Sequence, residues 1–397
     1  MSNLADALGA KAAQKPLSSS SSSSPPASTA RNTAAAAGVD SPVPVVDFAA
    51  FAAAGEGAGS NDEEAKKRAA RQIDDALRTV GFVYLQNHGV DAGKVKEMFE
   101  WSHRFFSLPT STKQLAPHPP GGSHHRGYSA PGVEKVTQHT YGADTLAALR
   151  AAAPDVKESF ECGNAANAAQ PNIWPPEDVL PGFREGCMRF FDQGAGLVHR
   201  VLRALGLALA GGSKDDDDDD DDDAGVDALS NAHAASAFQL RLLHYPSIPT
   251  RLLRSQAAAR IGAHSDFGSL TLLFQDSVGG LEIESPHGTG TFRAAPPVDG
   301  AVLVNVGDLL ERWSNGRWRS TVHRVGMPAG VGEGEDKGKE EEEEMCPPRY
   351  SIPFFAAPDP QTLIEALPGC WDEAENPKKY PPVTAEEYVT MRMSALY

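Results

Sequence analysis

The chain changes texture near Ala237, and this change constrains the fold more than any other feature. From there on, short apolar runs are bounded by Gly, Pro or Asp; they lie at 239–244, 269–274, 280–283, 301–306, 321–325 and 350–355. Several short strands at this spacing are typical of a β-sandwich or barrel. The antiparallel jelly roll of the cupins is one such architecture.

The half before this point mixes helices with a few strands. An apolar strand is expected at 43–48 and a buried strand at 82–85, after Gly81. Between them, Ser60 and Glu63 form a capping-box signature that opens a helix with apolar positions three and four residues apart. Further helices are expected at 92–106, from 183 to about 209, and from Thr384 to near the C-terminus. We therefore predict an α+β fold, in which a double-stranded β-helix core has a helical N-terminal region and a C-terminal helix.

Composition divides the chain into four regions. We expect an Ala/Ser-rich disordered tail at 1–42 and a mixed helical region at 43–235 with an acidic insertion at 214–223. A jelly-roll domain follows at 236–358 with a second acidic insertion at about 329–346, and a helical segment at 359–397 completes the chain. Homopolymeric acidic runs between elements are most simply solvated loops, so we expect both insertions to be disordered and without a catalytic role.

Charge and cysteine content narrow the class of protein. Most of the net charge of −17 lies in the two acidic insertions, so it says little about the substrate, although it argues against a nucleic-acid partner. The cysteines form no C-x-x-C pair, which suits a reducing compartment; they are Cys162, Cys187, Cys346 and Cys370.

No apolar stretch is long enough to cross a bilayer. Residues 1–40 have the composition of an organelle transit peptide and equally that of a disordered tail, which we favour. We expect a cytoplasmic monomer with no membrane partner.

His264, Asp266 and His323 are the candidate metal ligands. Alternate side chains on a strand share a face, so His264 and Asp266 would project together, and His323 lies on a later predicted strand. Two imidazoles and a carboxylate leave positions open on ferrous iron, whereas zinc, the competing metal, prefers four ligands and often sulfur. The remaining histidines that we considered keep an ordinary structural interpretation: His103, His199, His233 and His287.

Arg349 and Ser351 follow the last of these histidines and share one strand face. A guanidinium binds a carboxylate through two parallel hydrogen bonds, and a nearby hydroxyl donates another. Tyr245 is either a further donor to the same pocket or a core tyrosine. Together with the metal ligands, these residues indicate a non-haem iron oxygenase with a dicarboxylate co-substrate.

The chain resembles the isopenicillin N synthase-like branch of the iron(II)- and 2-oxoglutarate-dependent dioxygenases from about residue 43 to the C-terminus. The likeness is carried by GFVYLQNHGV at 81–90, GAHSDFGSLT at 262–271, VNVGD at 304–308, STVHRV at 320–325 and RYSIPFF at 349–355. The gap between His323 and Arg349 is longer than the family usually shows, and the second acidic insertion fills it.

The resemblance implies a role for each candidate residue. His264, Asp266 and His323 would bind Fe(II), Arg349 and Ser351 would hold the far carboxylate of 2-oxoglutarate, and Tyr245 matches a tyrosine that often assists there. The implied reaction consumes O2, forms succinate and CO2, and hydroxylates or desaturates a small-molecule substrate, with ascorbate as an optional reductant.

Three other interpretations stay open from the sequence. An iron oxidase of the same fold would not use 2-oxoglutarate, a non-catalytic jelly roll would only bind a ligand, and the acidic runs would serve as interaction tails or calcium-attracting patches. The substrate class is equally open among secondary metabolites, pyrimidines, flavonoid-like and hormone-like compounds. Candidate pocket residues are Phe267, Phe355 and the loop 125–128.

Overall fold

The computed structural model describes residues 41–52, 62–121, 124–135, 155–211, 222–255, 257–331 and 344–394. All of them belong to one compact unit, Asp40–Tyr397. The expectations for residues 1–40 and for most of both acidic insertions lie outside this part of the chain. Within it, no helix combines the length and the apolar character that crossing a membrane requires.

The centre of the fold is an eight-stranded sheet in the order β1-β2-β11-β8-β14-β5-β4-β3. Only β1 and β2 pair in parallel; every other neighbouring pair is antiparallel. In chain order these strands are β1 (Val45–Asp47), β2 (Phe82–Gln86), β3 (Gly127–Ser129), β4 (Glu158–Gly163), β5 (Gln239–Tyr245), β8 (Leu270–Gln275), β11 (Val302–Val306) and β14 (Arg349–Ala356).

A smaller sheet of four strands packs against one face of the large one. Its order is β10-β9-β12-β7, with bounds Phe292–Ala294, Leu281–Glu284, His323–Val325 and Ile261–His264. Side chains from both sheets form one buried apolar cluster, which includes Phe82, Leu243 and Leu303 from the large sheet and Leu281 and Ile283 from the small one. Two facing, mostly antiparallel sheets with a shared core are the expected jelly roll, and the α+β class is confirmed.

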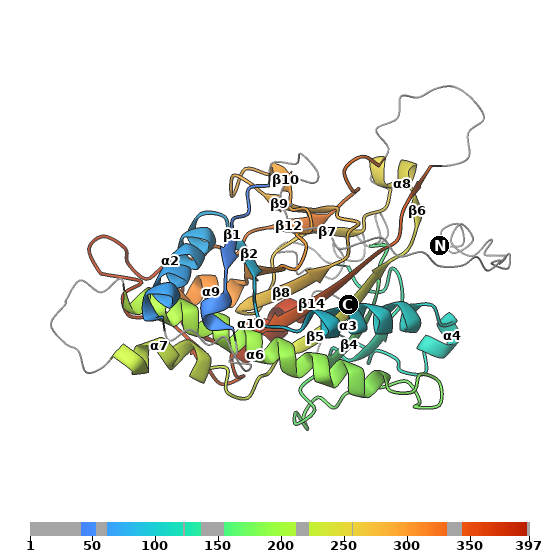
Figure 1. Cartoon of the computed structure of the whole chain (residues 1–397), viewed down its shortest axis with the longest axis horizontal. Coiled ribbons are helices and arrows are strands. Elements are labelled where there is room, and N and C mark those ends of the chain that lie inside the picture. The colour runs from blue at the N-terminus through green and yellow to red at the C-terminus, as the bar shows by residue number, and fades with distance from the viewer. Residues whose placement is uncertain are drawn as a thin grey trace, which may run out of the picture. The chain divides into compact units, whose positions relative to one another are not determined.

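Helices cover the other face of the large sheet. They are α2 (Glu63–Thr79), α3 (Ala92–Phe106), α6 (Phe183–Ala210) and α7 (Asp222–Asn231), and Figure 1 shows α6 running alongside α3 and α7. Close packing depends on Gly194 of α6, where a Cβ atom would lie 2.8 Å from the ring of Phe354 on β14. This side of the sheet therefore holds the larger apolar core.

Local sequence signals located the long helices well. The bounds of α3 match the predicted 92–106, and α6 ends one residue beyond the predicted 209. Ser60 lies outside the described residues, and the cap of α2 is Asp62, whose Oδ1 accepts a hydrogen bond of 3.0 Å from the Ala65 amide. Gly81 follows α2 with a φ of +79°, a backbone conformation that favours glycine.

The sequence missed β4 altogether. All six of its residues are buried, although several are polar or charged. The missing signal has a physical cause. The strand buries two glutamates, Glu158 and Glu161, which are paired with cations from elsewhere in the chain, so its sequence has no apolar pattern to detect.

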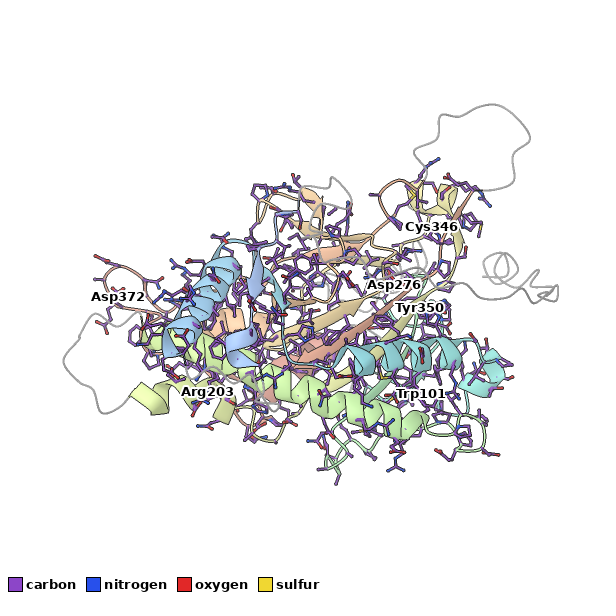
Figure 2. All side chains as sticks on the ribbon, viewed as in Figure 1. Trp101, Arg203, Asp276, Cys346, Tyr350 and Asp372 are labelled. Atoms are coloured by element: carbon purple, nitrogen blue, oxygen red, sulfur yellow. The ribbon has the colours of Figure 1, made fainter. Side chains whose placement is uncertain are left out.

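The second acidic insertion is more ordered at its end than expected. Met345–Cys346 form β13, which pairs with β6 (Ile248–Pro249), and the Cys346 side chain is buried. Cys346 is labelled in Figure 2. The expectation of a structureless loop through residue 346 is therefore wrong at this end, because the last residues find a strand partner next to α8 (Thr250–Arg254).

Short elements complete the fold. They are η1 (Ala49–Phe51), α4 (Thr110–Lys113), α9 (Asp308–Trp313), β15 (Leu363–Ile364), β16 (Val383–Thr384) and α10 (Ala385–Met393). The predicted start of the last helix is confirmed by a capping box between Thr384 and Glu387, but α10 ends at Met393 rather than near the C-terminus.

Candidate active site

His264, Asp266 and His323 meet between the two sheets. His264 ends β7 and His323 begins β12, and the two residues are direct partners in the antiparallel pairing of these strands. Their candidate ligand atoms and that of Asp266 all lie within 4.8 Å of one another. Asp266 Oδ1 is 3.9 Å from His264 Nε2 and 3.8 Å from His323 Nε2, and all three side chains are buried.

The strand argument for Asp266 is wrong. β7 ends at His264, so Asp266 is not on the strand, and alternation does not place it. Its position comes from the start of α9, where the Asp308 amide donates a hydrogen bond of 2.8 Å to the Asp266 carbonyl. Gly307 permits this approach, because a Cβ atom there would overlap the carbonyl oxygen of Gly268.

Hydrogen bonds orient all three side chains. His264 Nδ1 lies 2.8 Å from the Gly262 carbonyl and His323 Nδ1 lies 3.1 Å from the Thr321 carbonyl. A carbonyl only accepts, so each Nδ1 carries the hydrogen, and each Nε2 is left as the ligand atom. Asp266 Oδ2 accepts from Thr271 Oγ1 at 2.6 Å and from Asn305 Nδ2 at 2.8 Å, which leaves Oδ1 to face the imidazoles.

Electrostatics favour the metal-binding forms of these groups. Burial, and then the neighbouring His323, lower the pKa of His264, so its imidazole is neutral and has a lone pair to offer. Burial alone would raise the pKa of Asp266, but the two imidazoles and the hydrogen bonds from Asn305 and Thr271 outweigh it and leave the pKa lowered. Two imidazole nitrogens and one carboxylate oxygen that converge in this way fit a divalent iron ion.

Arg349 lines the same cavity as the candidate metal ligands. This arginine is the first residue of β14, and its side chain is buried. Its Nη1 donates a hydrogen bond of 3.1 Å to Ser351 Oγ, and its Nη2 donates one of 2.9 Å to Gln275 Oε1. Its Cζ lies 5.0 Å from the ring centre of Tyr245, its register partner on β5. Within the described part of the chain no carboxylate lies within 4.0 Å of this guanidinium, so a ligand carboxylate has an unclaimed cation to bind. The sequence did not point to Gln275.

β8 and β14 are held in register beside this group. Asp276, directly after β8, accepts a hydrogen bond of 2.5 Å from the Tyr350 amide, and its own amide donates to the Tyr350 carbonyl at 3.2 Å. Figure 2 labels both residues. This clamp fixes the backbone at Tyr350, between Arg349 and Ser351.

A single cavity of about 350 Å³ connects the two ends of the site. The metal ligands, Arg349, Ser351 and Tyr245 all line it, as do Phe267 and Phe355. Of the loop 125–128, His125 and Arg126 face the cavity, whereas Tyr128 instead donates a hydrogen bond of 2.7 Å to Glu158. The volume of the cavity lies within the range of small-molecule binding sites.

The C-terminal helix covers part of this cavity. Val389 and Met393 of α10 line it, and Arg392 of the same helix is almost wholly buried, at 2% exposure. The Arg392 guanidinium forms an ion pair with Asp308 and lies 4.3 Å from the ring centre of Phe267, the residue after Asp266. Sequence reasoning missed Arg392, because nothing in the terminal helix distinguishes it from an exposed arginine.

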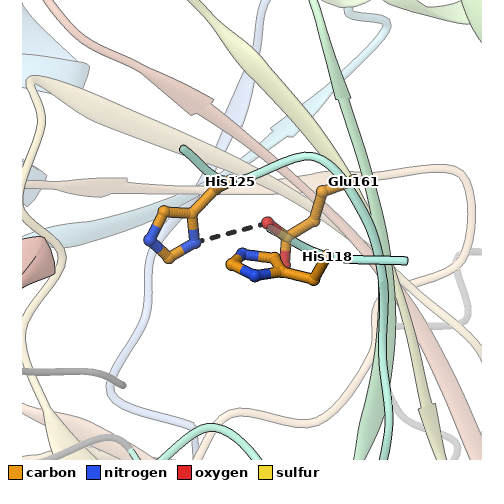
Figure 3. A group of neighbouring side chains, drawn as sticks. All are labelled: His118, His125 and Glu161. Carbon is orange, nitrogen blue, oxygen red and sulfur yellow. Dashed lines mark ion pairs between the residues drawn. The ribbon is translucent and has the colours of Figure 1, made fainter. Parts of the chain in front are cut away.

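A second group of metal-ligand type lies next to the cavity, which His125 lines. Figure 3 shows His118, His125 and Glu161, whose candidate ligand atoms also lie within 4.8 Å of one another. However, Arg241 Nε lies 2.9 Å from Glu161 Oε1 and Gln239 donates to Oε2 at 2.9 Å. A metal ion here would be repelled by the guanidinium, so we interpret the group as part of a buried ion network.

The other histidines keep their structural interpretation. His233 is buried between the Leu229 carbonyl and Ser269 Oγ, His199 lies between Ser230 and Ser236, and His103 packs against Tyr350. His287 is exposed.

Comparison with known proteins identifies the family. Residues 43–177 match the model described as non-haem dioxygenase in morphine synthesis N-terminal, and residues 237–358 match that of the 2OG-Fe(II) oxygenase superfamily. The 2-oxoglutarate-dependent dioxygenase frbA of Dothideomycetidae sp. is 36% identical over 80% of this chain and 88% of its own length. The chain belongs to the 2OG-Fe(II) oxygenase superfamily.

Further relatives of this oxygenase show the range within the family. The proline hydroxylase buaE of Petromyces alliaceus is 34% identical over 81% of this chain and 91% of its own length. The crystal structure of the Neurospora crassa thymine 7-hydroxylase in complex with alpha-KG and thymine is 37% identical, covers 89% of this chain and 96% of its own, and has a TM-score of 0.72.

The oxygenase is therefore an oxidoreductase that uses Fe(II), 2-oxoglutarate and O2. Its substrate is a small organic molecule, which it hydroxylates or desaturates with formation of succinate and CO2.

Proposed function

We propose that His264, Asp266 and His323 hold the ferrous ion and that Arg349 and Ser351 bind the far carboxylate of 2-oxoglutarate. The observation that carries the proposal is the shared cavity. Three converging ligand atoms line it, and so does a buried guanidinium that no carboxylate of the described residues approaches. Burial of a cation without a counter-ion is costly, and a ligand carboxylate removes that cost.

The iron would supply the site at which 2-oxoglutarate and dioxygen react to oxidise the substrate. The protein supplies the geometry. The Nδ1 hydrogen bonds of both histidines hold each Nε2 toward the Asp266 carboxylate, and Thr271 with Asn305 keep Oδ1 turned inward. Ser351 and Gln275 fix the guanidinium of Arg349, so the co-substrate would meet a rigid anchor.

The remaining lining of the cavity is mostly apolar and would position the substrate. Phe267, Phe355 and Val389 give the cavity apolar surface, and α10 covers it from the C-terminal end. Apolar surface around the reacting groups limits unproductive oxidation of the protein itself. We propose further that the oxygenase acts as a cytoplasmic monomer without a nucleic-acid or membrane partner, which its four unpaired cysteines and acidic insertions support.

Succinate formation from 2-oxoglutarate by the iron-loaded protein, with a metabolite panel as substrates, tests the function. His264→Ala should abolish iron binding in equilibrium dialysis. Arg349→Ala should leave iron binding intact and raise the KM for 2-oxoglutarate by about 10- to 100-fold, because it removes charge-assisted hydrogen bonds. Arg349→Lys keeps the charge but not the two parallel hydrogen bonds, so its KM for 2-oxoglutarate should lie between those of the wild type and Arg349→Ala.

Two outcomes would contradict the assignment of residues. Iron binding that survives His264→Ala would exclude this ligand set. Oxygen uptake that does not depend on added 2-oxoglutarate would instead favour an oxidase of the same fold and leave Arg349 without its proposed role.

A further inference from the structure

A buried network of charged residues borders the cavity, and two of its members, Glu134 and Arg241, line it. Glu134 pairs with Lys157 and, at 3.1 Å, with Arg241, and Arg241 also pairs with Glu161 at 2.9 Å. All four side chains are at least 92% buried. Within this network each carboxylate therefore has a cation and each cation has a carboxylate.

Arg126 in the cavity wall has no such partner. Its side chain is buried, at 4% exposure, and lines the cavity. Nη1 donates to the carbonyl of the adjacent His125 at 2.6 Å, Nε has no hydrogen-bond partner, and no carboxylate of the described chain lies within 4.0 Å. Among the described residues of the network and Arg126, two carboxylates thus accompany three cations, and the unmatched charge lies on Arg126.

The surroundings hold this guanidinium in place. It lies against Gly163 at the end of β4, where a Cβ atom would overlap it. Gly163 is fixed in turn by Asn172, which accepts from its amide at 2.7 Å and donates to its carbonyl at 2.8 Å. Burial lowers the pKa of Arg126, and nearby Cys162 and Glu161 offset this only in part. The cation is therefore pre-positioned but incompletely compensated.

We infer that Arg126 is a substrate-binding residue that anchors a carboxylate group of the substrate. A buried guanidinium that faces a cavity and lacks an acidic partner is stabilised most by a bound carboxylate, which it can hold through two hydrogen bonds. The substrate class is then a small carboxylic acid, oxidised at a carbon that the anchor presents to the metal end of the same cavity. This inference rests on the proposed function, since it takes Arg349 as the separate anchor of the co-substrate.

Calorimetric titration in the presence of manganese(II) and 2-oxoglutarate tests the inference without turnover. The probes are matched pairs of an acid and its neutral amide: N-acetyl-L-proline with N-acetyl-L-prolinamide, benzoate with benzamide, and uracil-6-carboxylate with uracil-6-carboxamide. Wild-type protein should bind at least one acid about 10-fold or more tightly than its neutral relative. Arg126→Gln should abolish that preference, and Arg126→Lys should keep part of it.

Arg104→Gln is the matched control, because it removes the same charge from an exposed position on α3. It should bind the acids as the wild type does. Thermal unfolding gives a second readout: Arg126→Gln should not lower the midpoint, because the change leaves no carboxylate unpaired. An arginine with a purely structural role would lower it.

Three results would overturn the inference. In the first, no acid is preferred over its neutral relative; in the second, the preference survives in Arg126→Gln. In the third, Arg126→Gln weakens the binding of 2-oxoglutarate and not that of the acids, which would mean that the arginine binds the co-substrate. A failure of the proposed function is distinct, since 2-oxoglutarate would then not bind to the manganese-loaded wild type at all.

Discussion

The ion pair between Arg392 and Asp308 should control whether the C-terminal helix stays docked over the site. Arg392 is 2% exposed and Asp308 is 8% exposed, so this is a buried pair. Arg392 also packs over the ring of Phe267 and approaches Ser265 Oγ at 3.4 Å. Arg392→Met keeps most of the apolar length of the side chain and removes the charge.

The size of the effect follows from what the change leaves behind. Breaking a buried ion pair from one side costs about 3–5 kcal/mol, because the other charge stays buried without its partner. Asp308 keeps a hydrogen bond of 2.7 Å from Ser320 Oγ, which places the cost near the lower end. Loss of the guanidinium–ring contact adds about 0.5–2 kcal/mol.

Most of this cost should appear as local opening of α10. The helix has nine residues, and isolated helices of that length are marginal in water, so docking rather than propensity holds it. A loss of about 3 kcal/mol corresponds to an opening equilibrium roughly 100-fold larger. Hydrogen exchange of the amides at 385–394 should accelerate by about that factor, whereas the amides of α6 serve as the internal control and should not change.

A double-mutant cycle with Asp308→Asn separates the pair from its surroundings. If the ion pair is the cause, Arg392→Met should cost much less in the Asp308→Asn background, because no buried carboxylate is left unpaired. Unchanged exchange in α10, or strictly additive effects of the two changes, would refute the reasoning and assign the docking of the helix to its apolar contacts.

Other features of the structure make further predictions. Asn305→Leu removes one of the two hydrogen bonds to the proposed aspartate ligand and should weaken iron binding about 10- to 100-fold in equilibrium dialysis, with tighter or equal binding as the contrary result. Glu134→Gln breaks the buried pairs of that carboxylate and should lower the free energy of unfolding at pH 7 by about 3–5 kcal/mol in urea titrations. Its paired cations hold the pKa of Glu134 at about 2 despite burial, below the ordinary 4.5, so its contribution is present above pH 4.5 and is lost as the pH falls toward 2. The difference between the two proteins should therefore shrink on acidification, and a constant difference would contradict the assignment. Gly194→Ala places a methyl group 2.8 Å from the Phe354 ring and should destabilise by about 1–3 kcal/mol, whereas the control Gly196→Ala meets only the end of a flexible side chain at 3.4 Å and should be neutral or stabilising.

Local sequence patterns were sufficient to predict the long helices and the strands after Ala237. The apolar spacing and the flanking Gly and Pro residues located α3 and α6 to within a residue, and Thr384 with Glu387 marked the start of α10. The change to short apolar runs after Ala237 predicted the jelly roll, because each half-buried strand carries its own pattern. The order of His264, Asp266, His323 and Arg349 along the chain also predicted the chemistry of the site before any geometry was known.

Only the tertiary structure decided how these residues are held. Asp266 lies beyond the end of β7 and is placed by α9, and its hydrogen-bond partner Asn305 comes from β11, so no local pattern connects them. The polar strand β4 and the burial of Arg392 and Arg126 are equally non-local. A charged residue has the same sequence signal whether it is solvated, paired or facing a cavity unpaired. Its role depends on partners that lie far away in the chain and meet it only in the folded protein.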